Sequence, residues 1–497
     1  MYNPHHLLIR ADAGGTLGIG HVMRMIALAQ AWKERGGRVT IASCRCPDAL
    51  VERIREEGID YENFGEIVMG SAEDLKSCIQ FAESDPNSWI ALDGYCFDEN
   101  FQKGLKQHGF KVLAVDDYGH CENWHTDLVL NQNIERRGAD SESFGKNFLI
   151  GPQYALLRRE FRDRKISESR ETGKGTKILL TFGGGDPTAS AVKVLHALNK
   201  LAPMNLEIKV LGGPANPNIP ALRDGASRSP HHVEVVSSSD DMPSLYTWAE
   251  RIISAGGSSC YEWLLFRRPG WVTSVAENQH AIVEAMLDQG IASGIQSLDS
   301  VSVDELGRRL SLWIENPVPQ QAPLVDGWGA LRVAAAMSDV GCWVRTVDFE
   351  TDARFLFDLA NEPTVRTAGY HSEAIAWVDH IAWLKRHIES ENSCLMLVEK
   401  FGRGPIGQVR FHRCDERAWE VGVSIVPDSR GGGNASQALR LAIRMHAIRE
   451  KPKEWIARIR KENRASQALF AKLDFVLESE AGEWQIWTLR NLNNRDL

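Results

Sequence analysis

Residues 7–40 read LLIRADAGGTLGIGHVMRMIALAQAWKERGGRVT, and this stretch decides the fold of the first part of the chain. An apolar run passes through a glycine-rich turn, and apolar residues then recur at helical spacing up to the glycine pair 36–37. Such a strand, turn and helix open a βαβ unit and predict a parallel sheet. His21 stands where the helix is expected to begin, and free N–H groups and the helix dipole favour an anion there. The stretch therefore predicts a phosphate site with a titratable base beside it.

The glycines of this turn, which include Gly18 and Gly20, let backbone N–H groups come close to a ligand. Their spacing is not G-x-G-x-x-G, and no Gly-Lys-Ser/Thr follows, so neither an NAD nor an ATP site is indicated. A tight turn with a structural histidine near the helix start is the alternative interpretation.

Later strands of this first part end in carboxylates. Apolar runs at 89–92 and 111–115 alternate with helix-like segments, which predicts a doubly wound parallel sheet. Ligands of such sheets bind beyond the carboxyl ends of the strands. The polar residues that follow these two strands are therefore candidates for one site: Asp93, Tyr95, Asp98, Asp116 and Asp117.

The same design recurs further along the chain. Apolar runs at 177–182, 207–211 and 251–255 precede glycine-rich turns, of which 183–188 and 256–259 can hold a pyrophosphate. Two such parts predict facing Rossmann-like lobes with a cleft between them. A solvated helix carboxylate and ordinary loop amides are the structural alternatives for the polar candidates of this lobe. The candidate contacts are Gly184, Gly257 and Ser258 for phosphate, Glu262 for ribose hydroxyls, and Asn278 and Gln279 for sugar hydroxyls.

A third pattern begins near Cys342, where a strand at 420–426 leads into the loop 430–435 and a helix at 436–449. A charged linker before Gly175 and a proline- and glutamine-rich stretch before Leu324 separate the parts. The sequence thus predicts an α/β protein of three domains: residues 1–165, 166–338 and 342–497.

Composition narrows the class of protein. The net charge of −9 gives no reason to expect nucleic acid or an anionic membrane as a partner. No run of about 18 apolar residues exists, and the first ten residues lack a signal-peptide pattern, so a cytoplasmic protein is expected. The nine cysteines are scattered, which favours reduced thiols and no metal site. The oligomeric state is left open.

Several motifs occur in a characteristic order along residues 7–337. They are Ala11-Asp12, GIGHVMR at 18–24, Asp93-x-Tyr95, GGGDP at 183–187, AGGSS at 255–259, Glu262, Asn278-Gln279 and DGWGALR at 326–332. With them this part resembles the UDP-sugar hydrolases of pseudaminic acid biosynthesis, relatives of glycosyltransferases with two Rossmann lobes (glycosyltransferase-B-like). The resemblance implies that water removes UDP from UDP-2,4-diacetamido-2,4,6-trideoxy-β-L-altropyranose without a metal.

The same resemblance implies roles for individual residues. His21 is the catalytic base, Tyr95 and Asn278 hold the sugar, and Glu262 holds the uridine ribose. Gly18, Gly20 and Arg24 belong to the motif around His21 and are expected to contact the substrate. UDP is a good leaving group, so the reaction needs water activation more than acid catalysis.

The third part resembles the GCN5-related N-acetyltransferases (GNAT). RGGGNA at 430–435 matches their pyrophosphate loop, R-x-x-G-x-G/A, and ENRASQALFAKLDF at 462–475 is similar to a second segment of the family. The resemblance implies acetyl-CoA as cofactor. It implies cofactor contacts at Val426, Arg430, Gly431, Gly433, Asn434, Ala435 and Asn463.

Two departures from the GNAT pattern concern the catalytic groups. Phe470 stands where many members have the tyrosine that protonates the thiolate, and Asp474 replaces a glycine. The acid is therefore not identified. Glu420 is predicted to be the base, directly or through water, and His412 is the alternative.

The fusion of the two parts suggests consecutive reactions in one pathway. An acetyltransferase would N-acetylate the 4-amino group of UDP-4-amino-4,6-dideoxy-N-acetyl-β-L-altrosamine, and the hydrolase would then release UDP. Other 2,4-diamino sugar pathways fit the same motifs. A UDP-sugar glycosyltransferase, a non-catalytic nucleotide-sugar binding protein and an acetyltransferase for a different amine are the alternatives.

Overall fold

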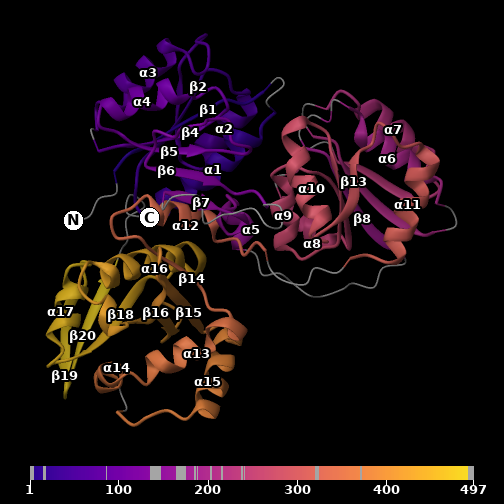
Figure 1. Cartoon of the computed structure of the whole chain (residues 1–497). Helices are drawn as coiled ribbons and strands as arrows, with labels where there is room; N and C mark the ends of the chain where they lie inside the picture. Colours follow the sequence, from indigo (N-terminus) through magenta and orange to yellow (C-terminus); the bar gives the residue numbers. More distant parts are fainter. Residues whose placement is uncertain are drawn as a thin grey trace. The chain divides into compact units, whose positions relative to one another are not determined.

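The computed structural model describes residues 5–14, 18–85, 87–134, 147–163, 175–183, 186, 188–201, 204–213, 216–236, 239, 241–318, 324–369 and 372–490. It contains three sheets (Figure 1). The chain forms two compact units, one of 5–31 and 38–333, the other of 32–37 and the chain from 334 onward. No helix in the described ranges is long and apolar enough to cross a membrane.

The first sheet has seven parallel strands in the order β3-β2-β1-β4-β5-β6-β7. The order reverses between β1 and β4, which is the point where doubly wound sheets bind ligands. Every residue of β1, β2 and β4 is buried, as expected when helices cover both faces. The strands are β1 (Leu7–Ala11), β2 (Val39–Ser43), β3 (Asp60–Asn63), β4 (Trp89–Asp93), β5 (Lys111–Val115), β6 (Leu128–Asn131) and β7 (Phe148–Ile150). The helices are α1 (Gly20–Glu34), α2 (Asp48–Glu56), α3 (Ala72–Ala82), α4 (Glu99–Gln107) and α5 (Arg159–Arg162).

The second sheet has six parallel strands in the order β10-β9-β8-β11-β12-β13, which repeats the reversal of the first sheet between β8 and β11. The strands are β8 (Thr176–Thr181), β9 (Leu206–Leu211), β10 (His232–Val236), β11 (Arg251–Ala255), β12 (Gly270–Ser274) and β13 (Ser293–Ser297). The helices are α6 (Ser190–Asn199), α7 (Ile219–Ser227), α8 (Met242–Trp248), α9 (Ser259–Leu265), α10 (His280–Asp288), α11 (Val303–Glu315) and α12 (Gly329–Ala336). The predicted fold of two Rossmann-like lobes is therefore confirmed.

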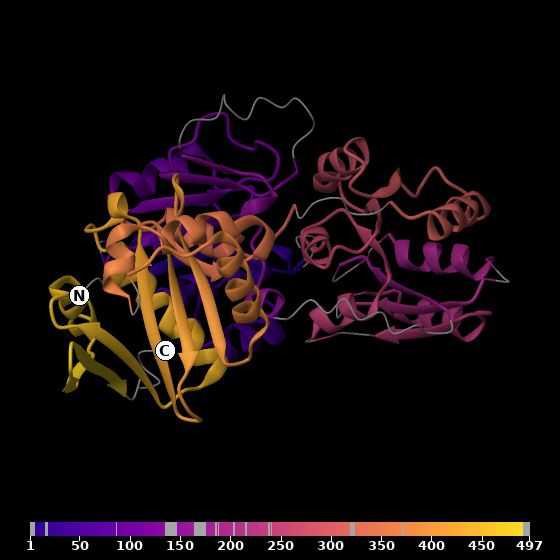
Figure 2. The same ribbon diagram turned by 90° about the horizontal axis from the view of Figure 1, so that it is seen from below.

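The third sheet is mostly antiparallel, in the order β14-β15-β16-β17-β18-β20-β19, and Figure 2 shows it from a second direction. Its one parallel pair among the described strands is β17 with β18. The strands are β14 (Cys342–Thr346), β15 (Ser393–Lys400), β16 (Gly404–Arg413), β17 (Ala418–Ile425), β18 (Glu454–Arg460), β19 (Val476–Ala481) and β20 (Trp484–Arg490). The helices are α13 (Phe349–Ala360), α14 (Pro363–Ala368), α15 (Trp377–Glu389), α16 (Asn434–Glu450) and α17 (Arg464–Ala471).

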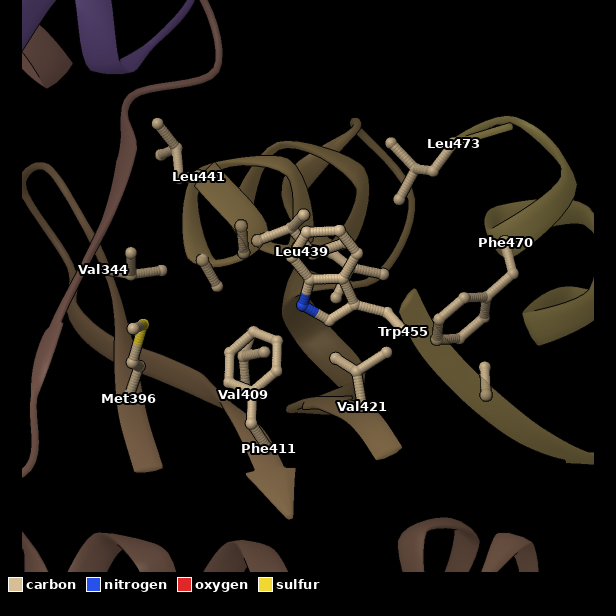
Figure 3. Packing of buried hydrophobic residues seen from close by; sticks show 14 of the residues in the cluster. Val344, Met396, Val409, Phe411, Val421, Leu439, Leu441, Trp455, Phe470 and Leu473 are labelled. Carbon is tan, nitrogen blue, oxygen red and sulfur yellow. The ribbon is translucent and has the colours of Figure 1, made fainter. Parts of the chain in front are cut away.

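The core of this third sheet forms where α16 packs on its strands. Figure 3 shows Leu439 of α16 in one cluster with Phe411 of β16 and Trp455 of β18. All three are nearly inaccessible to solvent, so the cluster holds the start of α16 firmly against the sheet.

Candidate active sites

His21 lies in the first turn of α1, beside the carboxyl end of β4. Its Nδ1 is 2.7 Å from Oδ1 of Asp93, the last residue of β4, and the Asp93 carboxylate is completely buried. β4 pairs directly with β1, the strand that leads into α1. The sheet order therefore brings together two residues that are 72 positions apart.

Arg24, one helical turn after His21, holds the same carboxylate. Its Nε and Nη2 donate to the two oxygens of Asp93 at 2.7 and 2.6 Å, and its Nη1 and Nη2 donate to Asp117 at 2.8 and 2.9 Å. Burial alone would raise the pKa of Asp93, but the charges of Arg24 and His21 hold it well below its ordinary 3.8. Asp93 is therefore an ionised acceptor at neutral pH.

This ionisation decides how the imidazole carries its proton. An ionised carboxylate only accepts hydrogen bonds, so the short contact to Asp93 requires a proton on His21 Nδ1. The neutral ring then has its lone pair on Nε2, the nitrogen directed away from the carboxylate. Such an imidazole can accept a proton from water, and Asp93 would stabilise the resulting cation.

Tyr95 extends this network. Its hydroxyl donates to Asp117 at 2.8 Å and accepts from Nδ2 of Asn278 at 3.3 Å, and its ring meets the His21 ring edge to face. Burial and the charge of Asp117 raise the pKa of Tyr95 above its ordinary value. Tyr95 is therefore a neutral phenol beside His21, suited to hydrogen bonding rather than to proton abstraction.

The remaining predicted residues of the first lobe divide into two groups. Gly18 has a φ of +69°, which favours glycine, and a Cβ at Gly20 would make an ordinary 3.7 Å contact with Oγ of Ser258. Asp98 caps α4 by accepting from the Phe101 N–H. Asp98 is thus explained by local structure.

Glu262 of α9 lies in a protein network of its own. Its carboxylate accepts from the Tyr246 hydroxyl at 3.0 Å, and Nη2 of Arg158 lies 3.5 Å away. Burial raises the pKa of Glu262, and the charge of Arg158 opposes that rise. A ribose hydroxyl would have to share the carboxylate with these partners.

The loop residues near Glu262 have mixed roles. The amide oxygen of Gln279 accepts from the Val275 N–H at 3.0 Å, so it shapes the loop after β12. A Cβ at Gly257 would meet Nε2 of Gln279 at 3.5 Å. Gly184 lies outside the described residues.

The third sheet opens at β17. This strand pairs with β16 as far as Ile425, but with β18 only from Ala418 to Glu420. Beyond Glu420 the two strands separate, and N–H groups of β17 that do not face β16 become available to a ligand. A cavity of about 1460 Å³ begins at this opening and is lined by Val421–Ile425.

The glycine loop after β17 lines the same cavity. Gly431, Gly432 and Gly433 all have φ between +48° and +82°, a conformation that side chains rarely adopt. No atom lies within 4 Å of a Cβ built on Gly431 or Gly432, so the backbone there is open to a ligand. The loop leads directly into α16, whose start favours anions.

The charged lining of the cavity is mostly cationic. Its anions are Asp379 and Glu462. Its cations are Arg366, Arg386, Arg410, Arg430, Arg458, Arg460 and Lys472. With seven positive and two negative side chains, this cavity suits polyanionic ligands.

Comparison with known protein families agrees with this geometry, because a model described as the acetyltransferase (GNAT) domain matches residues 343–476. Residues 343–476 form a GNAT acetyltransferase domain.

The chain is also similar to individual known proteins. It is 26% identical over 345 residues to the spore coat polysaccharide biosynthesis protein SpsG of Bacillus subtilis, covering 67% of this chain and 98% of SpsG. It is 22% identical over 288 residues to the UDP-2,4-diacetamido-2,4,6-trideoxy-beta-L-altropyranose hydrolase of Campylobacter jejuni, covering 57% and 97%. Among solved structures, MurG of Acinetobacter baumannii has a TM-score of 0.45 at 16% identity, covering 66% of this chain and 95% of MurG.

Within the GNAT domain, Arg430 contacts protein groups in the described structure. Its Nε donates to the Ile425 carbonyl at 2.9 Å, and its Nη1 and Nη2 donate to Thr364 and Glu362 at 2.6 and 3.1 Å. A bound diphosphate would compete for the guanidinium with these two partners at the start of α14. Ala435 lines the cavity beside it.

Three other predicted cofactor contacts of the GNAT domain mainly support its backbone. The Val426 N–H donates to Ile406, and Asn434 is buried and donates to the Ser429 carbonyl. Neither is among the described residues that line the cavity. Asn463 lines it but also caps α17 by accepting from the Ser466 N–H.

The predicted base of the GNAT domain, Glu420, lies on the paired part of β17, and its carboxylate is 3.1 Å from Nε of Arg458. Neither Glu420 nor the exposed His412 is among the described lining residues. The position of Glu420 therefore favours a role through Arg458, which does line the cavity.

Sequence reasoning did not assign partners to the residues that organise the His21 site and the network around Glu262. Asp93 and Asp117 were recognised only as carboxylates at strand ends, and Arg158 was not recognised at all. The order of the strands was the available signal, because neighbouring parallel strands end at one edge.

Proposed function

We propose that this chain is a bifunctional nucleotide-sugar enzyme of pseudaminic acid biosynthesis. Its first two lobes hydrolyse UDP-2,4-diacetamido-2,4,6-trideoxy-β-L-altropyranose to the free sugar and UDP. Its GNAT domain N-acetylates the 4-amino group of UDP-4-amino-4,6-dideoxy-N-acetyl-β-L-altrosamine. The observation that carries the proposal is the imidazole of His21, fixed by an ionised, buried Asp93 at the start of a helix.

In the hydrolytic step, Nε2 of His21 accepts a proton from water while the water oxygen attacks the anomeric carbon. The bond between that carbon and the diphosphate oxygen breaks, and UDP leaves with the bonding electrons. Asp93 stabilises the imidazolium through Nδ1–H. The site around His21 is bordered by Gly18, Gly20, Arg24 and Tyr95. The nucleotide would be bound by Gly257, Ser258 and Glu262, and the sugar would lie near Asn278 and Gln279. The step uses no metal.

The features of the GNAT domain fit acetyl-CoA. The open glycine loop, Arg430 and the start of α16 would hold its diphosphate, and the free edge of β17 would receive its thioester carbonyl. Acetyl-CoA would supply the activated acetyl group. The excess of cationic side chains in the lining favours an anionic acceptor such as a nucleotide-linked amino sugar.

The test is incubation with UDP-4-amino-4,6-dideoxy-N-acetyl-β-L-altrosamine, with and without acetyl-CoA, followed by mass spectrometry. The acetylated UDP-sugar should appear first, and free diacetamido sugar and UDP should then accumulate. UDP release that requires an added sugar acceptor would instead indicate a glycosyltransferase. Binding without turnover of any UDP-sugar would indicate a binding protein.

The role of His21 is tested by His21→Asn. The variant should lose at least about 10² in kcat, since general-base catalysis is worth about 10²–10⁴ in rate, and calorimetry should still show UDP binding. If a folded His21→Asn protein no longer binds UDP, then His21 is a ligand-binding residue and not the base.

A further inference from the structure

The turn after β5 presents an aromatic ring beside the His21 site. Tyr118 is 54% exposed, and its ring centroid lies 4.8 Å from that of Tyr95. The Tyr95 ring in turn meets His21 at 5.3 Å. Tyr118 therefore continues the aromatic surface of the site outward into solvent.

The backbone of this turn is held firmly. The carboxylate of Asp116 accepts from the N–H groups of Tyr118, Gly119 and His120, and Nδ1 of His120 is 3.1 Å away. Burial would raise the pKa of Asp116, but these hydrogen bonds lower it, so the carboxylate stays ionised. The neighbouring Asp117 carbonyl accepts from Asn133 at 2.7 Å. A fixed backbone with an exposed ring is suited to binding, because little conformational freedom is lost when a ligand packs on it.

The surroundings of the ring indicate which part of a ligand it meets. Two carboxylates lie beside this ring, because Asp116 accepts from the Tyr118 N–H and Asp117 accepts from the hydroxyl of the adjoining Tyr95, so the ring is a poor contact for phosphate. A neutral, apolar group of the substrate is the better match for the ring face. On the proposed function, the sugar is deoxygenated at C6 and carries two acetamido groups, so it offers methyl groups where common sugars carry hydroxyls.

We propose that Tyr118 is a specificity residue of the hydrolytic site, whose exposed ring packs against a methyl group of the sugar and selects deoxy, acetamido sugars over hydroxylated ones. This inference rests on the proposed function of that site. The methyl comes from C6 or from an acetamido group.

The test compares kcat/KM of wild type, Tyr118→Ala and Tyr118→Phe on UDP-2,4-diacetamido-2,4,6-trideoxy-β-L-altropyranose and on its analogue with a hydroxyl at C6. One apolar contact of methyl size is worth about tenfold or more in discrimination. Tyr118→Ala should lose about tenfold on the trideoxy substrate, mainly through KM, and Tyr118→Phe should keep wild-type values. Loss of the preference between the two substrates would assign the contact to C6. An equal loss on both would assign it to an acetamido methyl.

Binding measurements keep this proposal separate from the hydrolase proposal. In His21→Asn protein, Tyr118→Ala should weaken the UDP-sugar about tenfold and leave UDP affinity unchanged. Val68→Ala, which removes an apolar side chain that is 76% exposed elsewhere in this lobe, should change neither. If the wild type binds the UDP-sugar without hydrolysing it, the hydrolase proposal fails and the Tyr118 comparison still stands. If Tyr118→Ala leaves UDP-sugar affinity unchanged, or weakens UDP equally, the Tyr118 proposal is overturned.

Discussion

Replacing Asp93 by asparagine keeps the shape of the side chain but removes the negative charge beside His21. Both oxygens of Asp93 are in use, because Oδ1 accepts from His21 and from Nη2 of Arg24, and Oδ2 accepts from Nε of Arg24. An amide has one oxygen, so its NH2 group must face a donor. If it faces Arg24, a charge-assisted hydrogen bond is lost. If it faces His21, the imidazole must move its proton to Nε2, and the base disappears.

The magnitudes follow from these contacts. Breaking a buried ion pair by removing one partner costs about 3–5 kcal/mol, and the lower end applies here because Arg24 keeps Asp117. The catalytic loss should lie between about 10² and 10⁴ in kcat, the range of general-base catalysis. Because the pKa of Asp93 is depressed below 3.8, its contribution to stability is complete above about pH 5. The stability difference between wild type and variant should therefore be constant from pH 8 to 5 and shrink below pH 4.

The assay measures UDP release, urea unfolding and UDP binding on the same preparations of Asp93→Asn and wild type. CoA binding by the GNAT domain of the same chain is the internal control for protein concentration and folding. Asp98→Asn is the matched control, since Asp98 only caps α4 and should not change kcat. A folded Asp93→Asn protein with kcat within threefold of wild type would refute the role of Asp93 in holding the imidazole.

Two further outcomes are expected in the GNAT domain. Burial lowers the pKa of His446 from 6.5 to about 3, so the unfolded state takes up the proton first as the pH falls. The unfolding free energy should therefore drop by about 1.4 kcal/mol per pH unit below pH 6.5. Urea unfolding at several pH values should show a flatter dependence of this free energy on pH in His446→Phe than in wild type. The same dependence in both proteins would contradict the role of His446. Arg430→Ala should raise the Kd for CoA about 10- to 100-fold in calorimetry, because it removes a charge-assisted hydrogen bond. An unchanged Kd would exclude Arg430 from the diphosphate site.

Local pattern was sufficient for much of the fold. Apolar runs at 89–92, 111–115, 177–182, 207–211 and 251–255 placed five strands, β4, β5, β8, β9 and β11, within one residue, since such runs are a property of neighbouring residues alone. The strands β3, β6, β7, β10 and β13 were not predicted. The loop from Arg430 to Ala435 and the helix after it were predicted for the same reason, although α16 begins at Asn434, two residues before the predicted start.

Side-chain partners were decided by tertiary structure. The sequence alone could place His21 at a helix start and Asp93 at a strand end, but it could not pair them across 72 residues. That pairing exists because β1 and β4 are neighbours in the sheet, and Arg24 reaches Asp117 because β5 is the next strand along. In the GNAT domain, too, the sequence alone could not assign the partner of Glu420, because only the folded sheet brings its carboxylate close to Arg458. The spacing of a motif predicts the backbone conformation of one segment. Which nitrogen of an imidazole carries the proton depends instead on which distant carboxylate the fold buries against the ring.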